Sequence, residues 1–144
     1  MIINKNARRN YSFTDKVVAG VVLTGAEVKS LRAGRGSLRD AHAKFVGGEL
    51  FLLGMDIPQY KNYSGKAEYD AKRSRKLLLK KSEIEKLLRK IEGKKLTLIP
   101  IRLFFKGRWV KCEIVVGKGK KEYEKREDIK KRDVKREMAK AMKK

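Results

Sequence analysis

The sequence has few of the residues from which covalent, metal and catalytic sites are built. Its 144 residues include one cysteine, Cys112, and one histidine, His42. A single cysteine excludes an internal disulfide and a thiolate metal cluster, which is typical of a reducing compartment. No apolar run approaches the roughly 20 residues of a membrane span, and residues 1–10 lack the apolar segment of a signal peptide. We therefore expect a cytoplasmic protein with no membrane association.

Enzymatic activity is not expected either. A catalytic histidine needs a partner within hydrogen-bond reach, and the sequence places no cysteine or acidic cluster beside His42. Residues 117–120 are rich in glycine and lysine but lack the spacing of a phosphate-binding loop. We predict no cofactor, no metal and no catalytic residue, and we interpret His42 and Cys112 as packing or surface residues.

Positive charge is what the sequence has in excess. Thirty-nine Lys and Arg against 17 Asp and Glu give a formal net charge of +22 and a pI near 10.2. Such a field concentrates polyanions at the surface and speeds their capture, so nucleic acid is the first candidate partner. The basic residues cluster at Lys29 with Arg32, at 73–76, at 80–81 and at 118–121.

Tyrosines lie among these basic residues, where an exposed ring can stack on an unpaired base for roughly 1–3 kcal/mol. They are Tyr60, Tyr63, Tyr69 and Tyr123. The first three could equally pack on the body of the protein. Stacking is favoured for Tyr123, because its neighbours in sequence offer it nothing apolar to pack on.

The first part of the chain predicts a strand followed by a basic helix. The strand pattern begins at Tyr11, after a basic arm outside the body, and Val17–Leu23 is β-branched, with Gly20 marking a bulge or bend. Thr24-Gly25-Ala26-Glu27 fits a capping box, and Gly34 supplies a left-handed stop. One face of this helix can plug a core, and the other can meet an anion.

The middle of the chain predicts a hairpin, a long loop and a second helix. Two glycines, Gly47-Gly48, satisfy the positive φ angles of a two-residue turn between strands within 40–53. Residues 54–74 are a long polar segment of the kind that is functional or disordered. Ser82-Glu83-Ile84-Glu85 predicts a second capping box, and apolar residues at helical spacing continue to Ile91.

Two further strands complete the predicted body. In residues 96–105, Ile99, Ile101 and Leu103 are expected on one side, and Pro100 suggests an edge or bulge. In 110–116 alternate residues should point inward, with Lys111 and Glu113 outward. About six strands with helices at the openings predict a mainly β, OB-fold-like antiparallel barrel over residues 1–117. Residues 118–144 form a basic tail, predicted to be disordered when free and helical on an RNA surface.

Four stretches are together specific enough to indicate a family. They are AGVVLTGAEVKSLRAGR (19–35), GGELFLLGMDI (47–57), RKLLLKKSEIEKL (75–87) and GKGKKEYEKRE (117–127). In order and spacing they resemble the SsrA-binding protein family, small protein B of bacteria. The resemblance implies a barrel that binds the tRNA-like domain of transfer-messenger RNA and delivers it to stalled ribosomes for tagging of the nascent peptide. It also implies that the tail enters the decoding centre and the empty mRNA channel.

The resemblance also implies functional residues. Contacts to the tRNA-like domain are expected at Asn4, Arg8, Tyr11, Glu27, Lys29, Arg32, Arg75, Lys76, Leu78 and Lys80. Contacts in the decoding centre and mRNA channel are expected at Lys118, Lys120, Lys121, Tyr123, Lys125, Arg126 and Met142. The capping role of Glu27 would account for that residue without RNA.

The implied partners are transfer-messenger RNA and the 70S ribosome with its small-subunit rRNA. Alanyl-tRNA synthetase and elongation factor Tu are implied only indirectly, through the RNA, and the protein is expected to be a monomer. The sequence departs from the family pattern at Val18, where a glutamate is frequent, at Lys80, where a histidine or asparagine is common, and at Glu124, which replaces an aspartate. These departures change the expected RNA footprint in detail.

Two other classes of protein fit parts of the same pattern. A basic ribosomal structural protein or general RNA-binding protein would also combine a basic barrel with a basic tail. An RNA-modifying enzyme would need a nucleophile or a cofactor pocket, which His42 and Cys112 do not supply by themselves.

Overall fold

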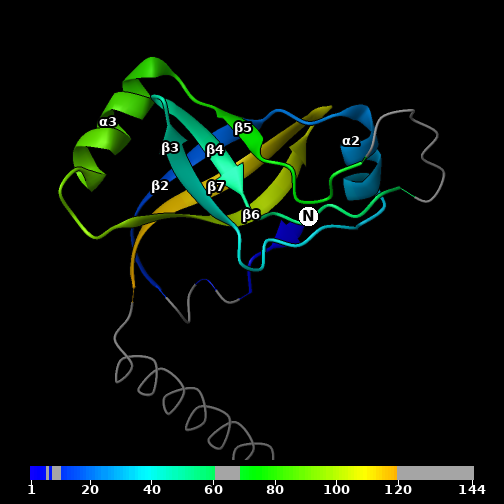
Figure 1. Ribbon diagram of the computed structural model, residues 1–144, viewed down its shortest axis with the longest axis horizontal. Helices are drawn as coiled ribbons and strands as arrows, with labels where there is room; N and C mark the ends of the chain where they lie inside the picture. The colour runs from blue at the N-terminus through cyan, green and yellow to red at the C-terminus, as the bar shows by residue number, and fades with distance from the viewer. Residues whose placement is uncertain (6, 8–10, 61–68, 120–144) are drawn as a thin grey trace, which may run out of the picture.

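The computed structural model describes residues 1–5, 7, 11–60 and 69–119. Within them a barrel of β-strands has one helix at each end (Figure 1). The strands are β1 (Ile2–Ile3), β2 (Tyr11–Val21), β3 (His42–Val46), β4 (Glu49–Leu53), β5 (Arg75–Leu78), β6 (Thr97–Lys106) and β7 (Trp109–Gly119). The helices are α2 (Gly25–Arg32) and α3 (Lys81–Ile91).

The strands close on themselves. Six of them follow the order β6-β3-β4-β5-β2-β7, and β7 pairs back with β6, with every pairing antiparallel. The short β1 adds to β6 through Ile2 opposite Leu103. This arrangement confirms the predicted mainly β barrel of about six strands with short helices.

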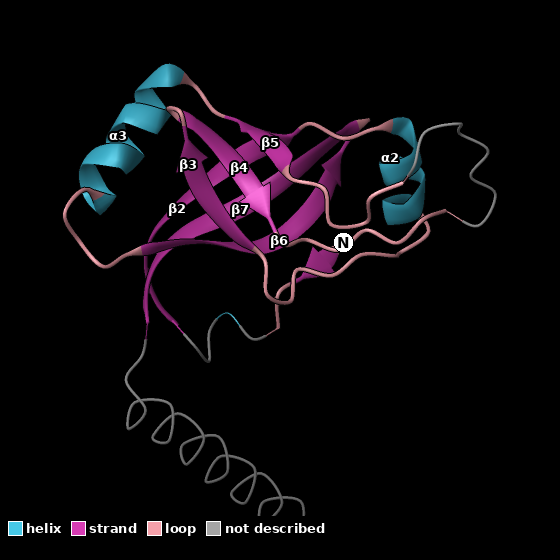
Figure 2. Ribbon diagram, in the orientation of Figure 1, coloured by secondary structure: helices cyan, strands magenta, loops and turns pink. Residues whose placement is uncertain are grey.

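The core fills the barrel, and each helix contributes one buried leucine to it. Cys112 and Ile114 of β7 are fully buried, together with Leu52 of β4. Leu31 of α2 and Leu87 of α3 join the same cluster from opposite ends, where the helices cover the barrel openings (Figure 2). Burial raises the pKa of the Cys112 thiol to about 12, so this cysteine is an uncharged packing residue at neutral pH.

Two local predictions are confirmed in atomic detail. Gly47 and Gly48 have φ angles of 60° and 81°, and Val46 lies opposite Glu49 across the two-residue turn. At the start of α2, the Thr24 hydroxyl accepts from the Glu27 N–H at 3.2 Å, and the Glu27 carboxylate accepts from the Thr24 N–H at 2.9 Å. Turn chemistry and capping therefore determine these two elements, as the sequence patterns predicted.

The second predicted capping box is wrong in its register. The helix begins at Lys81, one residue before the proposed cap Ser82, and the Glu83 carboxylate accepts from the Lys80 N–H at 3.1 Å. Glu83 thus fills the position that was expected for Glu85, because an acid three residues after the cap can reach back to its N–H.

The predicted bulge positions are partly wrong. Gly20 lies in a regular ladder, and the irregularity of β2 falls between Phe13 and Asp15. In β6 the register shifts between Pro100 and Arg102, as the proline suggested. This shift reverses the alternation, so Ile99 packs on the outer face and Leu103 packs in the core, rather than both on one side.

Two surface predictions hold only in part. The arm before Tyr11 is not wholly outside the body, because Ile3 pairs with β6 and Ala7 is buried against Ile99 and Val115. Glu113 does point outward from the barrel, yet it is only 3% exposed. It forms an ion pair with Lys16 at 2.5 Å and a second with Arg102, which cover the carboxylate on the outer face of the sheet.

Candidate nucleic-acid interface

A buried ion pair fixes α2 to the barrel. Glu27 of α2 and Arg75 of β5 are 1% and 0% exposed, and their side chains meet at 2.6 Å. Arg73 approaches the other Glu27 oxygen, also at 2.6 Å. The remaining guanidinium donors of Arg75 reach the carbonyls of Met55 at 2.5 Å and Ala71 at 3.0 Å. This cluster ties together α2, β5 and both described ends of the 54–74 segment.

The charge of Glu27 is stabilised in this setting. Burial by itself would raise the pKa of its carboxyl, but hydrogen bonds from Arg73, the Thr24 N–H and Arg75 hold that pKa below its ordinary value. Direct RNA contact was expected for both Glu27 and Arg75, yet neither side chain reaches the surface. In this structure both side chains lie beneath the surface, where their ion pair joins α2 to β5.

The exposed face of α2 carries two of the predicted contact residues. Lys29 and Arg32 are both exposed. The Arg32 guanidinium carbon lies 4.8 Å from the ring centroid of Phe105 in β6, a cation–π distance. The helix therefore presents its cations from a fixed position beside the end of β6.

Three more of the predicted contact residues lie on strand β5 or just after it. Lys76 forms an ion pair with Glu49 at 3.2 Å, Leu78 is 53% exposed and Lys80 is exposed. Leu78 lies opposite Gly20 in the β2–β5 ladder. Val18 of β2 and Val22, which directly follows β2, are exposed as well. We call the set Lys29, Arg32, Lys76, Leu78 and Lys80 the α2–β5 face. It combines cations with one exposed apolar side chain, Leu78, which suits an RNA that presents both phosphates and bases.

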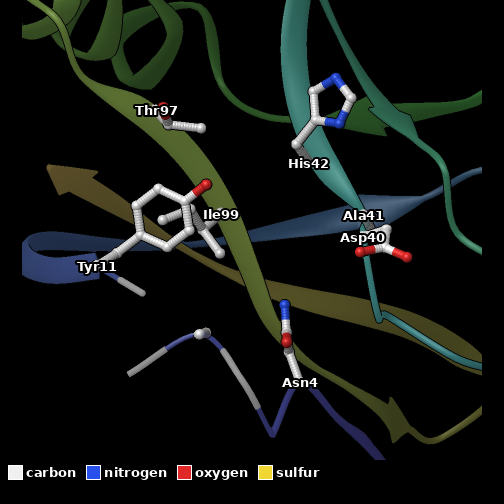
Figure 3. Close-up of a pocket in the computed structure, with 8 residues that line it drawn as sticks. Asn4, Tyr11, Asp40, Ala41, His42, Thr97 and Ile99 are labelled. Carbon is white, nitrogen blue, oxygen red and sulfur yellow. The ribbon is translucent and has the colours of Figure 1, made fainter. Parts of the chain in front are cut away.

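The other predicted contact residues that the structure describes lie away from the α2–β5 face. Asn4 and Tyr11 line a cavity of about 230 Å³ with Asp40, His42 and Thr97, as Figure 3 shows. Asn4 is held there by its N–H to the Ile101 carbonyl at 2.9 Å and its side-chain amide to the Pro100 carbonyl at 3.0 Å. Lys118 is exposed near the same end, since Tyr11 pairs with Gly119.

The predicted contacts thus form two groups rather than one. Tyr11 begins β2, whereas Gly20, opposite Leu78, lies near its end. Nine residues of strand at about 3.3 Å each separate these points by roughly 30 Å. The α2–β5 face and the cavity around Asn4 and Tyr11 are therefore separate surfaces of the barrel.

Several predicted residues lie outside the described part of the chain. They are Arg8, Lys120, Lys121, Tyr123, Lys125, Arg126 and Met142. Their roles stay predictions. Of the loop tyrosines, Tyr69 donates its hydroxyl to the Ile57 carbonyl at 2.6 Å, which favours the packing interpretation for that ring.

One exposed aromatic was not predicted from the sequence. Trp109 opens β7 and is 64% exposed, beside Arg108. The signal was present, because Val110 points inward and the alternation of β7 then places Trp109 on the opposite side.

Neither a metal site nor a spanning helix emerges from the described residues. No three of their His, Cys, Asp and Glu side chains gather closely enough to hold a metal ion. None of their helices has the length and apolar character required to cross a membrane.

Comparisons with known proteins agree on one family. A family model described as SmpB protein matches residues 1–144. An SsrA-binding protein of Salinispora arenicola is 51% identical over 96% of this chain and 86% of its own length. One of Microcystis aeruginosa is 46% identical over 97% of this chain and 91% of its own length. A solved structure described as "tmRNA-SmpB: a journey to the center of the bacterial ribosome" aligns with a TM-score of 0.68 and 41% identity, covering 83% of this chain and 84% of that one.

Proposed function

Because the chain belongs to the SmpB protein family, we propose that it binds transfer-messenger RNA and acts with it on the ribosome in trans-translation. The family match spans the whole chain, and the relatives carry the name SsrA-binding protein. The structural observation that supports the proposal is the α2–β5 face. There, exposed cations and the exposed Leu78 lie on a helix and a strand that a buried ion pair joins.

The first component of the proposal is recognition of the tRNA-like domain by the barrel. Lys29, Arg32 and Lys80 are exposed and can neutralise phosphates, whereas Leu78 offers an apolar contact. Folded RNA is recognised largely by its shape and its sugar–phosphate surface, which suits a rigid face of this kind. In this proposal Glu27 and Arg75 position that face.

The second component concerns the tail. The part of the tail beyond Gly119, where β7 ends, enters the decoding centre and the empty mRNA channel, with Tyr123 stacking on a base and Lys125 and Arg126 contacting rRNA. Alanyl-tRNA synthetase and elongation factor Tu are met only through the RNA, and the protein acts in the cytoplasm as a monomer without catalysing a reaction. The support for this component is the basic composition of the tail and its resemblance to the family motif.

Binding measurements with whole and truncated protein test the first component. Since β7 extends to Gly119, the truncation belongs after that residue. Both forms are titrated with transfer-messenger RNA and with an unrelated structured RNA of equal length at several salt concentrations. We expect selective binding by both forms. Equal affinity for the two RNAs with a steep salt dependence would contradict the proposal, because counterion release alone would then explain binding.

A sedimentation experiment separates the proposal from a ribosomal structural role. We expect the protein to co-sediment with ribosomes stalled on truncated messages. A stoichiometric presence on every ribosome would instead favour a structural protein of the ribosome.

A further inference from the structure

The tip of the β6–β7 hairpin carries the one tryptophan of the chain. Trp109 is 64% exposed, and it is the only aromatic among the large hydrophobic side chains of the described residues that are exposed. A single exposed apolar residue is ordinary. Trp109, however, forms one wall of a groove, so its exposed ring is available to a ligand bound there.

Four elements or their flanks build this groove. Trp109 of β7 faces Leu78 of β5, Val28 of α2, and Val22, which directly follows β2, around a space of about 330 Å³. Val22 and Leu78 are 43% and 53% exposed, so the walls are apolar and open to solvent. We call the set Gly20, Val22, Val28, Leu78 and Trp109 the tryptophan groove.

Glycine at position 20 keeps the floor of the groove low. A Cβ placed on Gly20 would lie 3.5 Å from Leu78 Cβ and 3.8 Å from Lys111 Nζ, which are ordinary contact distances. A side chain there would therefore be tolerated sterically, and it would occupy space that glycine leaves open to a ligand.

The charge around the groove selects the class of ligand. Arg108 and Lys111 line it, and of the described lining residues none is acidic. The Arg108 guanidinium carbon lies 5.3 Å from the indole centroid, so a cation already rests over the ring. An apolar protein segment would use the walls but gain nothing from these cations. A phosphate alone would use the cations but leave the walls in water.

A nucleobase attached to its phosphodiester uses both features. We propose that the tryptophan groove holds an unpaired base of a structured RNA, with Trp109 as the stacking platform and Arg108 and Lys111 on the flanking phosphates. This inference rests on the proposed function, because it specifies how the same protein contacts RNA. The flat face of an indole accepts any base, so the groove selects for an unpaired nucleotide rather than for a sequence.

The single tryptophan makes the inference directly measurable. Tryptophan emission, excited selectively over that of the five tyrosines, reports Trp109 alone. We would titrate the full chain with the tRNA-like domain of transfer-messenger RNA, and separately with a blunt RNA duplex that has the same number of phosphates. Stacking should quench the emission in the first titration and leave it unchanged in the second at matched occupancy.

Variants distinguish stacking from simple apolar contact. Trp109→Leu keeps apolar surface but has no aromatic face, whereas Trp109→Phe keeps a smaller one. We expect Trp109→Leu to weaken binding of the tRNA-like domain roughly 5- to 100-fold, and Trp109→Phe to retain most of the affinity. Val46→Ala is the matched control, because Val46 is 54% exposed at the tip of the other hairpin. It should leave affinity unchanged.

Each contrary outcome has one meaning. Equal quenching by the duplex, or equal affinity of Trp109→Leu and the unmodified protein, would overturn the inference. In a parallel titration with ribosomal proteins, quenching of the Trp109 emission by these proteins but not by RNA would also overturn the inference. That result would assign the groove to a protein partner. If selectivity for transfer-messenger RNA persists in these cases, the proposed function survives. Loss of that selectivity in the unmodified protein would instead refute the proposed function itself.

Discussion

At the scale of single residues, the feature that matters most is one carboxylate that is hidden from solvent. Glu27 completes the cap of α2 and also neutralises Arg75, which is 0% exposed. Removing one member of a buried pair leaves an uncompensated charge, which costs about 3–5 kcal/mol. We therefore expect Glu27→Gln to lower the free energy of unfolding by an amount of that order, measured in urea.

The control for this variant is Glu49→Gln. Glu49 pairs with Lys76 at 3.2 Å, but both side chains are about half exposed. Exposed pairs contribute about 1 kcal/mol or less. Equal losses in the two variants would show that burial of the Glu27–Arg75 pair has no special importance.

Acid should destabilise the protein through the same carboxylate. The pKa of Glu27 is held below its ordinary value of 4.5. The pKa of Glu113 is lowered as well: burial alone would raise it, but hydrogen bonds from Lys16 and Arg102 have the larger effect. The unfolded chain therefore takes up these protons first. Stability is complete above the ordinary value and falls as the pH drops through the folded-state pKa values. Unfolding followed between about pH 6 and pH 3 should show this fall, and Glu27→Gln should show a shallower one.

At the scale of elements, the turn between β3 and β4 depends on two glycines. Gly48 has a φ of 81°, and a Cβ added there would meet nothing within 4 Å, so only backbone strain opposes substitution. Gly48→Ala should cost about 1–2 kcal/mol in unfolding free energy. Gly25→Ala is the control, because Gly25 also has open space but starts a helix without a positive φ. That variant should be neutral or slightly stabilising.

Comparison of this turn with other elements shows why some local sequence patterns predict structure correctly and others do not. The Gly47-Gly48 turn and the Thr24 cap are determined within four residues, so the sequence predicts them correctly. The shift between Pro100 and Arg102 was suggested by the proline, but its consequence for Ile99 and Leu103 depends on pairing with β7. The burial of Glu113 likewise depends on Lys16, which lies 97 residues earlier and becomes a neighbour only when the barrel closes. Contacts of that kind are invisible to a periodicity argument.

At the scale of the whole molecule, the family resemblance identified residues but could not arrange them. It placed Asn4, Tyr11 and Leu78 in a single set of contacts, and the barrel separates them along the length of β2. It also included Glu27 and Arg75, whose spacing in the sequence does not reveal that they pair beneath the surface. Trp109 was overlooked because no motif contains it. Its importance depends on the groove that four distant segments form around it.

Charge removal can test which surface binds the RNA. Replacing Lys29, Arg32 and Lys80 with alanine should reduce the slope of log affinity against log salt by about one for each lost phosphate contact. A second triple variant, at Lys44, Lys94 and Lys95, removes the same charge from exposed positions outside the α2–β5 face. We expect its slope to stay near that of the unmodified protein. Equal slopes in the two triple variants would mean that net charge, rather than this face, controls binding.

The division of labour between barrel and tail is the widest claim, and a double variant tests it. Lys125→Ala with Arg126→Ala removes two cations from the tail but leaves the α2–β5 face intact. We expect nearly unchanged affinity for transfer-messenger RNA and loss of peptide tagging on stalled ribosomes, because binding and tagging would depend on different parts of the chain. Lys143→Ala with Lys144→Ala removes the same charge from the end of the tail and should affect tagging less. If RNA affinity fell in parallel with tagging in the first variant, barrel and tail would act as one RNA-binding surface.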